Sequence, residues 1–169
     1  GRIGEEKGIR ILMQIWDRIQ DIPLVVMGGG PLEEEFRAWA ETKDNVLFLG
    51  YTQHDKCLSI VKKAEFVVFP SIWYEGCSMV EIEAESLGKG LIATDLGFSE
   101  EAIYNGVNGF KVPLGSVDSF EQTIRKLWAD PDQIAVIGKN ARMDYEAKYL
   151  PEDNYRQLER IYNVVTKET

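Results

Sequence analysis

Short apolar runs alternate with longer amphipathic stretches between residues 9 and 112, and this alternation constrains the fold more than any other feature of the sequence. The stretches have helical periodicity, and the runs, bounded by glycine, proline or polar residues, have the length of buried strands. The expected strands are residues 24–27, 46–49, 66–69, 91–94 and 110–112. Strands separated by helices of this length join through right-handed crossovers. The sequence therefore predicts an α/β fold with a doubly wound, mostly parallel sheet.

After residue 117 the pattern is helical throughout, which predicts a helical C-terminal tail. The expected helices are residues 118–129, 131–148 and 151–167. No repeat, low-complexity tract or linker interrupts the sequence, so residues 1–169 are expected to form a single Rossmann-like domain.

Four loops are expected at the same edge of this sheet: residues 28–30, 50–52, 70–78 and 95–99. Each follows a strand, and ligands of doubly wound sheets bind beyond the carboxyl ends of the strands. The topology alone therefore predicts a binding site at this edge.

The sequence begins with Gly1-Arg2-Ile3 and has no strand ahead of its first helix. A doubly wound domain normally begins with a strand. Two explanations are open: the sheet lacks its usual first strand, or the chain is cut from a longer polypeptide.

Composition excludes several classes of function. The net charge of −9 argues against a general affinity for nucleic acid or for anionic membranes. One histidine and two cysteines without metal-ligand spacing make a metal site unexpected. The sequence shows neither a membrane-spanning run nor a signal-peptide pattern, so a cytoplasmic location is expected.

The run Gly28-Gly29-Gly30 suggests a dinucleotide fingerprint, but Glu33 occupies the position where that fingerprint requires a third glycine. A tight strand-to-helix turn that lets a ligand approach the backbone is the better interpretation.

Arg2 and Lys7 lie near the start of the first helix. Such a pair is, in isolation, more typical of solvated loop charges. Its position at the binding edge favours a phosphate clamp, formed by a guanidinium fork and an ammonium point charge.

Glu75 and Glu83 stand out because of where they fall. Ser78 is expected to cap a helix, with Glu81 completing a capping box. On a helical wheel Glu83 falls in the middle of the apolar face, while Glu81 and Glu85 point the other way. A carboxylate on an apolar face needs a partner or a ligand. Either Glu83 pairs with a basic side chain and Glu75 is merely exposed, or both bind a polyhydroxylated ligand.

These features belong to an ordered set of motifs that extends from Gly1 to Val112. They are Gly1-Arg2, Glu6-Lys7-Gly8, Gly28-x-Gly30-Pro31, Asn45-Val46-x-Phe48-Leu49-Gly50-Tyr51, Pro70-Ser71-x-x-Tyr74-Glu75-Gly76, Glu83-Ala84, Gly88-Lys89, Ala93-Thr94-Asp95 and Asn108-Gly109. The set resembles the nucleotide-sugar-binding half of retaining glycosyltransferases of the GT-B architecture, and within these most closely family 4. The two glutamates match that family's Glu-x7-Glu element.

The resemblance implies a role for each matched position. Arg2 and Lys7 would contact the donor diphosphate, catalytic Glu75 would face the transferred sugar, and Glu83 would bind the ribose hydroxyls. Sugar and phosphate would be approached by the backbone of Gly76, Cys77, Ser78, Met79 and Val80, and the base would lie near Gly28, Gly30 and Tyr51. Gly90, where the family often has proline, and Cys77, where phenylalanine is frequent, depart from the pattern without removing a charge.

The implied reaction transfers a hexose from a UDP-, GDP- or ADP-sugar to an acceptor hydroxyl, with no cofactor or metal ion. The resemblance covers only the donor-binding half, so the chain is expected to be an inactive fragment that lacks the N-terminal acceptor domain. That domain would bind the acceptor glycan or glycolipid of surface polysaccharide or glycolipid synthesis. It would also supply any peripheral contact with the inner face of the membrane.

Two other functions stay open. A stand-alone nucleotide-binding or regulatory module would need no second domain. A nucleotide-sugar epimerase would require catalytic residues that the sequence does not show.

Overall fold

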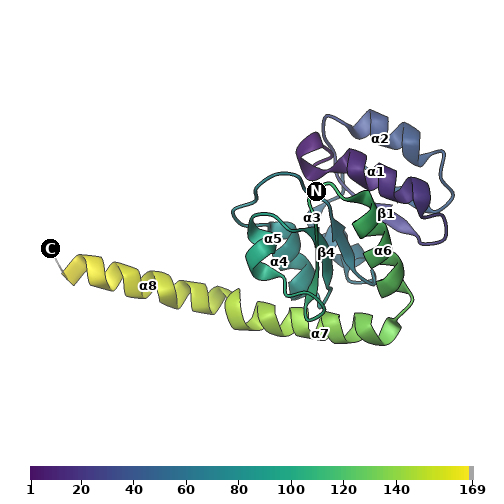
Figure 1. Ribbon diagram of the computed structural model, residues 1–169. Helices are drawn as coiled ribbons and strands as arrows, with labels where there is room; N and C mark the ends of the chain where they lie inside the picture. The colour runs from purple at the N-terminus through teal and green to yellow at the C-terminus, as the bar shows by residue number, and fades with distance from the viewer. Residues whose placement is uncertain (168–169) are drawn as a thin grey trace.

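Within residues 1–167, which the computed structural model describes, helices and parallel strands alternate as the sequence predicts (Figure 1). The strands are β1 (Leu24–Val26), β2 (Val46–Phe48), β3 (Val67–Phe69), β4 (Leu91–Thr94) and β5 (Gly109–Val112). The α-helices are α1 (Ile9–Arg18), α2 (Glu33–Ala40), α3 (His54–Val61), α4 (Met79–Ser86), α5 (Phe98–Ala102), α6 (Val117–Trp128), α7 (Pro131–Lys148) and α8 (Pro151–Lys167). A 3₁₀ turn, η1 (Glu5–Lys7), precedes α1.

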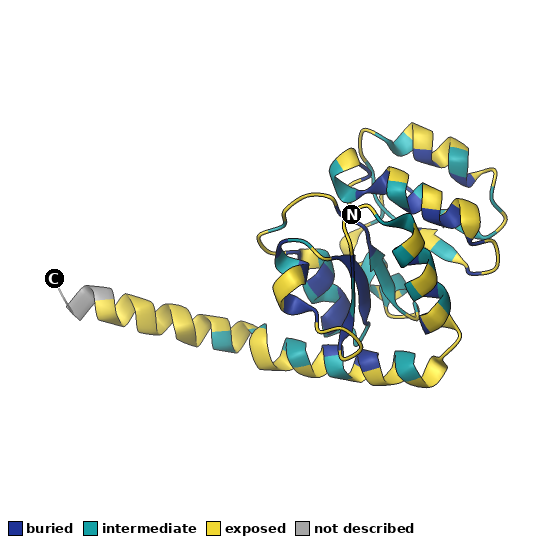
Figure 2. Ribbon diagram, in the orientation of Figure 1, coloured by how far each residue is buried: buried dark blue, intermediate teal, exposed yellow. Residues whose placement is uncertain are grey.

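The strands form two parallel ladders. One joins β1 to β2, and the other has the order β3-β4-β5. The central strand β4 is buried along its whole length (Figure 2). Its side chains alternate between two clusters: Ile92 joins the core on one face, while Leu91 and Ala93 join the core on the other. A strand covered on both faces accounts for the uninterrupted apolar run.

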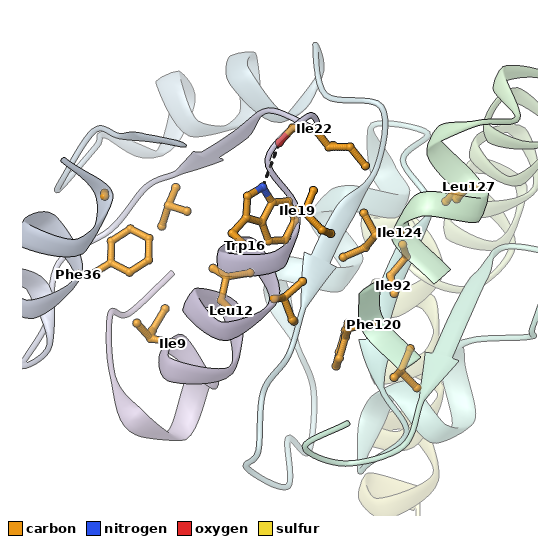
Figure 3. Close-up of a cluster of buried hydrophobic side chains, with 14 of the residues drawn as sticks. Ile9, Leu12, Trp16, Ile19, Ile22, Phe36, Ile92, Phe120, Ile124 and Leu127 are labelled. Atoms are coloured by element: carbon orange, nitrogen blue, oxygen red, sulfur yellow. Dashed lines mark hydrogen bonds between the residues drawn. The ribbon is translucent and has the colours of Figure 1, made fainter. Parts of the chain in front are cut away.

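The larger core lies between the strands and helices α1, α2 and α6 (Figure 3). The predicted stripe on α1 is confirmed, since Ile9, Leu12, Ile15 and Trp16 are all buried. Trp16 Nε1 donates a hydrogen bond to the carbonyl oxygen of Ile22 at 3.1 Å, which satisfies its buried polar group. Each fully buried apolar side chain of this size contributes about 2 kcal/mol to the hydrophobic stabilisation.

The smaller core covers the opposite face of the three-stranded ladder. It contains Phe69, Ala84, Leu91, Ala93 and Ile103, from β3, α4, β4 and the end of α5. Helix α7 packs along α4 and also contacts α6. Helix α4 is therefore enclosed by the sheet on one side and by α7 on another.

Helix α8 projects away from this body (Figures 1 and 2). Tyr155, Leu158, Ile161 and Val164 are exposed along it. The expected helical tail is thus present, and these four side chains are left exposed to solvent. None of the helices within residues 1–167 is both long and apolar enough to cross a membrane.

Residues 1–8 lie between the carboxyl ends of the two ladders. The amino group of Gly1 donates to Met27 O at 2.9 Å, just beyond β1, and Gly8 packs against Pro70, just beyond β3. Among the described residues, β1 pairs only with β2, and β3 pairs only with β4. In the strand order 3-2-1-4-5-6 of doubly wound folds, the strand that precedes the first helix lies at this junction.

Candidate functional site

The loops at the carboxyl edge of the strands are joined by backbone hydrogen bonds. Ile3 N–H donates to Gly29 O at 3.0 Å and Gly28 N–H to Gly50 O at 2.8 Å. The remaining loops are joined by Ile72 N–H to Glu6 O at 3.0 Å and Phe98 N–H to Glu75 O at 2.8 Å. The convergence predicted from topology is therefore confirmed, and η1 belongs to the same edge.

Gly8 shows how closely η1 approaches the loop after β3. Its φ is 69°, in the left-handed region, and a Cβ there would lie 1.8 Å from Pro70 O. Any other residue would both strain the backbone and collide with the loop. Glycine at this position therefore brings Lys7, its neighbour, against the loop that carries Glu75.

Lys7 and Glu75 form an ion pair, Nζ to Oε1, in a partly buried position. Glu75 Oε1 also accepts from Ser71 Oγ at 3.3 Å, and Lys7 Nζ lies 5.7 Å from the centre of the Phe69 ring. The structure thus brings together a predicted phosphate ligand and the predicted catalytic residue. Sequence reasoning did not single out Ser71, although it belongs to the Pro70-Ser71 motif.

Arg2, the other half of the predicted clamp, pairs with Glu6, Nε to Oε1, at 3.4 Å. Its side chain is largely exposed. Arg2 and Lys7 are each paired with a glutamate, so a clamp of the two on one ligand stays a prediction.

The first turn of α4 faces this edge, as predicted. Ser78 caps the helix, since its Oγ accepts from Glu81 N–H at 3.4 Å. The N–H groups of Met79 and Val80 belong to the first turn, where a helix supplies no partner of its own. A Cβ on Gly76 would meet no atom within 4 Å, and Cys77 and Met79 are exposed. A ligand can therefore approach the backbone of this segment.

The predicted orientation of α4 is wrong. Glu81 and Glu85 are buried, at 1% and 2% exposure, whereas the Glu83 side chain is 31% exposed and Met79 is exposed. The wheel placed Glu83 on the buried face because apolar residues share its arc of the helix. On the buried face of α4, Glu81 lies toward α5, and the helix packs against α7. Both α5 and α7 carry polar groups there.

These surroundings explain how two acids are tolerated inside. Glu81 Oε1 accepts from Ser99 Oγ at 2.9 Å, while Oε2 of both Glu81 and Glu85 has no hydrogen-bond partner in the described structure. Burial raises the pKa of Glu81 to about 7, against hydrogen bonds to Ser99 and Ser78 that lower it. Burial, followed by the charge of Asp144, raises the pKa of Glu85 to about 7. Both carboxyls are therefore easily protonated near neutral pH.

Glu83 faces α3 across the edge. Its Oε1 lies 3.7 Å from Nε2 of His54, the first residue of α3. No residue near His54 in the sequence offers it a partner. Only the packing of α3 beside α4 reveals this contact, and no local sequence signal would have found it.

Gly28, Gly30 and Tyr51 lie at the same edge. A Cβ on Gly28 would lie 1.7 Å from Gly1 O, and one on Gly30 would lie 2.4 Å from Ile3 O. Close packing against residues 1–3 accounts for both glycines without a ligand. Tyr51 is 82% exposed. Their contact with a nucleotide base stays a prediction.

The residues that the structure describes contain no group of three or more His, Cys, Asp or Glu side chains able to hold a metal ion. The electropositive groups of this edge are cationic side chains and helix N–H groups. Among the cations, Lys7 is paired with Glu75.

Comparison with known proteins gives a family. The model of the family "Glycosyl transferases group 1" matches residues 1–144. The chain is 32% identical over 145 residues to D-rhamnosyltransferase WbpZ of Pseudomonas aeruginosa, covering 82% of this chain and 37% of that protein. It is 28% identical over 177 residues to the capsular polysaccharide biosynthesis glycosyltransferase CapM of Staphylococcus aureus, covering 100% of this chain and 46% of that protein. The chain thus spans less than half the length of each of these relatives.

Solved structures share the fold. Anabaena Alr3699/HepE in complex with UDP superimposes with a TM-score of 0.88 at 21% identity, covering 97% of this chain and 47% of that one. The C-terminal domain of LpcC, a glycosyl transferase group 1 family protein from Francisella tularensis, gives a TM-score of 0.78 at 22% identity, covering 89% of this chain and 84% of that one.

Proposed function

Because the chain belongs to the family of glycosyl transferases group 1, we propose that it is the donor-binding domain of a retaining GT-B glycosyltransferase of family 4. The observation that carries this proposal is the arrangement at one edge of the strands. Lys7 is paired with Glu75, and the backbone of the first turn of α4 is accessible. Glu83, whose side chain is 31% exposed, lies in the following turn of the same helix.

Each group suits one part of a nucleoside diphosphate sugar. Lys7, with Arg2 drawn from Glu6, binds the diphosphate, together with the N–H groups at the start of α4. Glu83 accepts hydrogen bonds from the ribose hydroxyls, and Glu75 faces the transferred sugar. Gly28, Gly30 and Tyr51 lie beside the base.

The reaction breaks the bond between the anomeric carbon and the diphosphate and forms one to the acceptor oxygen with retained configuration. Its products are the glycoside, the nucleoside diphosphate and one proton. Lys7, Arg2 and the helix N–H groups stabilise the charge that develops on the departing diphosphate, so we propose that no metal ion is required.

We also propose that this domain works with an N-terminal acceptor domain, since the relatives are more than twice as long as the matched region. The named role of CapM supports an acceptor in surface polysaccharide synthesis, and such an acceptor would bring the enzyme to the inner face of the membrane.

The test is calorimetric titration of the chain with UDP-, GDP- and ADP-sugars. We expect one of the three bases to be preferred, and Lys7→Ala to weaken binding of that donor about tenfold through the lost charge contact. Lys43→Ala is the matched control. Lys43 pairs with Asp17 near the C-terminal end of α1, whereas Lys7 lies just before the N-terminal end of the same helix. Absence of binding to every nucleotide sugar would refute the donor-binding role. Transfer activity in the isolated chain would refute the need for a second domain.

A further inference from the structure

His54 is the chain's only histidine, and the structure places it beside the carboxylate proposed to bind ribose. Its Nε2 lies 3.7 Å from Glu83 Oε1, its side chain is 64% exposed, and it begins α3 directly after the Gly50–Thr52 loop. It therefore lies at the proposed binding edge, free of any role in the core.

The contact leaves Glu83 free to act. It involves Oε1, and the side chain stays 31% exposed, so a ribose hydroxyl can still reach the carboxylate. A carboxylate that accepts two hydroxyl hydrogen bonds must be ionised and held in one orientation. An imidazolium beside it favours both, whereas a neutral imidazole supplies no charge.

The Gly1 amino group is a further charged group close to Glu83. Burial lowers its pKa, the nearby Cys57 and Glu83 act in the opposite direction, and Lys7 lowers it further. Lys7 belongs to η1 and Cys57 to α3. None of them is seen to contact the Glu83 carboxylate as His54 does.

We propose that His54 is a positioning residue for Glu83, and that a positive charge on its imidazole strengthens donor binding. The inference rests on the proposed function and deepens it by adding a second side chain to the ribose subsite.

The experiment measures the affinity for UDP-glucose, GDP-mannose and ADP-glucose at pH 6 and pH 8. These probes are pyrophosphate diesters, so they lack the terminal phosphate that titrates near pH 6 in a nucleoside diphosphate. For the probe that binds, His54→Lys, which is charged at both pH values, should bind about three- to fivefold more tightly than His54→Gln, the range of an exposed ion pair.

Three variants separate His54 from the other titrating groups. The wild-type affinity should match that of His54→Lys where the imidazole is charged and that of His54→Gln where it is neutral. Glu83→Gln should bind weakly at both pH values. Any dependence left in His54→Gln belongs to Glu81, Glu85 or the amino group of Gly1.

The outcomes are distinct. If His54→Lys binds no more tightly than His54→Gln, the positioning role is refuted while the donor site stands. If none of the three probes binds at either pH, the proposed function and this inference fail together.

Discussion

Helix α4 carries glutamates on two sides, and their surroundings differ in nearly every respect. On the open side, Glu83 is 31% exposed, lies 3.7 Å from His54 and shares its edge with the pair of Lys7 and Glu75. On the closed side, Glu81 and Glu85 are almost fully buried, and one oxygen of each has no partner in the described structure.

This difference shows that the role of a carboxylate depends on whether water and cations reach it. Solvent and a cation keep a carboxylate charged and ready to accept hydrogen bonds from a ligand. Burial raises the pKa of Glu81 and Glu85 to about 7, so these two are partly neutral at physiological pH. Changes on the open side should therefore alter donor chemistry, and changes on the closed side should alter stability.

The largest expected effect is on the open side. Glu75→Ala, in the enzyme that contains this domain, should lower transfer about a thousandfold while leaving nucleotide affinity largely intact, since Glu75 faces the sugar. Initial rates with saturating donor measure the first quantity and calorimetry measures the second. Glu81→Gln is the control on the closed side and should keep transfer near the wild-type rate. Full activity in Glu75→Ala would remove the assigned role.

The closed side predicts a pH dependence of stability. Glu81 and Glu85 have folded-state pKa values near 7, raised from 4.5, so the folded state holds more protons than the unfolded state between those values. The extra free energy of unfolding that comes from these bound protons is fully present below pH 4.5. It is lost as the pH rises through 7. From pH 5 to pH 8 each of the two carboxyls should lower the free energy of unfolding by about 2.5 kcal/mol.

Urea unfolding at both pH values measures this fall. Combining Glu81→Gln with Glu85→Gln should remove most of the difference and raise stability at pH 8. Glu83→Gln, on the open side of the same helix, should leave the fall unchanged. A wild-type stability that stays constant or increases from pH 5 to pH 8 would contradict the assignment.

A smaller effect is expected for Glu83→Ala. Losing hydrogen bonds from a charged acceptor to ribose should weaken donor affinity about 10- to 100-fold. Calorimetric titration with the preferred nucleotide sugar measures the loss. Glu85→Gln, two residues along on the closed side, should bind normally. Equal affinities for Glu83→Ala and wild type would place the ribose elsewhere.

The smallest expected effect concerns Ser78, the N-cap residue of α4. Ser78→Ala removes the N-cap and should lower the free energy of unfolding by about 1 kcal/mol. Ser86→Ala is the control, because Ser86 Oγ only bonds back to Glu83 O within the helix. Urea unfolding should show a clear loss for the first and little for the second. Equal losses would mean that the cap contributes nothing specific.

Much of the fold could be predicted from the sequence. All five strands lie where short apolar runs predict them, and the three C-terminal helices begin and end within one residue of their expected bounds. Ser78 caps α4 as predicted. These features follow from local propensity and periodicity, which act over a few neighbouring residues.

The sequence could not reveal which face of α4 is buried. Periodicity assigned the buried face from its apolar residues, but Ser99 from α5 offers Glu81 a buried partner that lies 18 positions away. The contact of His54 with Glu83 is equally non-local, since it depends on how α3 and α4 pack.

The sequence by itself determined the α/β alternation, the edge at which the loops gather and the residue types available there. Each of these follows from the order of residues along the chain and from the rule that parallel strands present their carboxyl ends at one edge. The tertiary structure alone decided that Lys7 meets Glu75, that Glu83 faces His54 and that Glu81 and Glu85 are buried. Burial and pairing depend on groups brought together from distant segments, and those surroundings set the charge of a carboxylate.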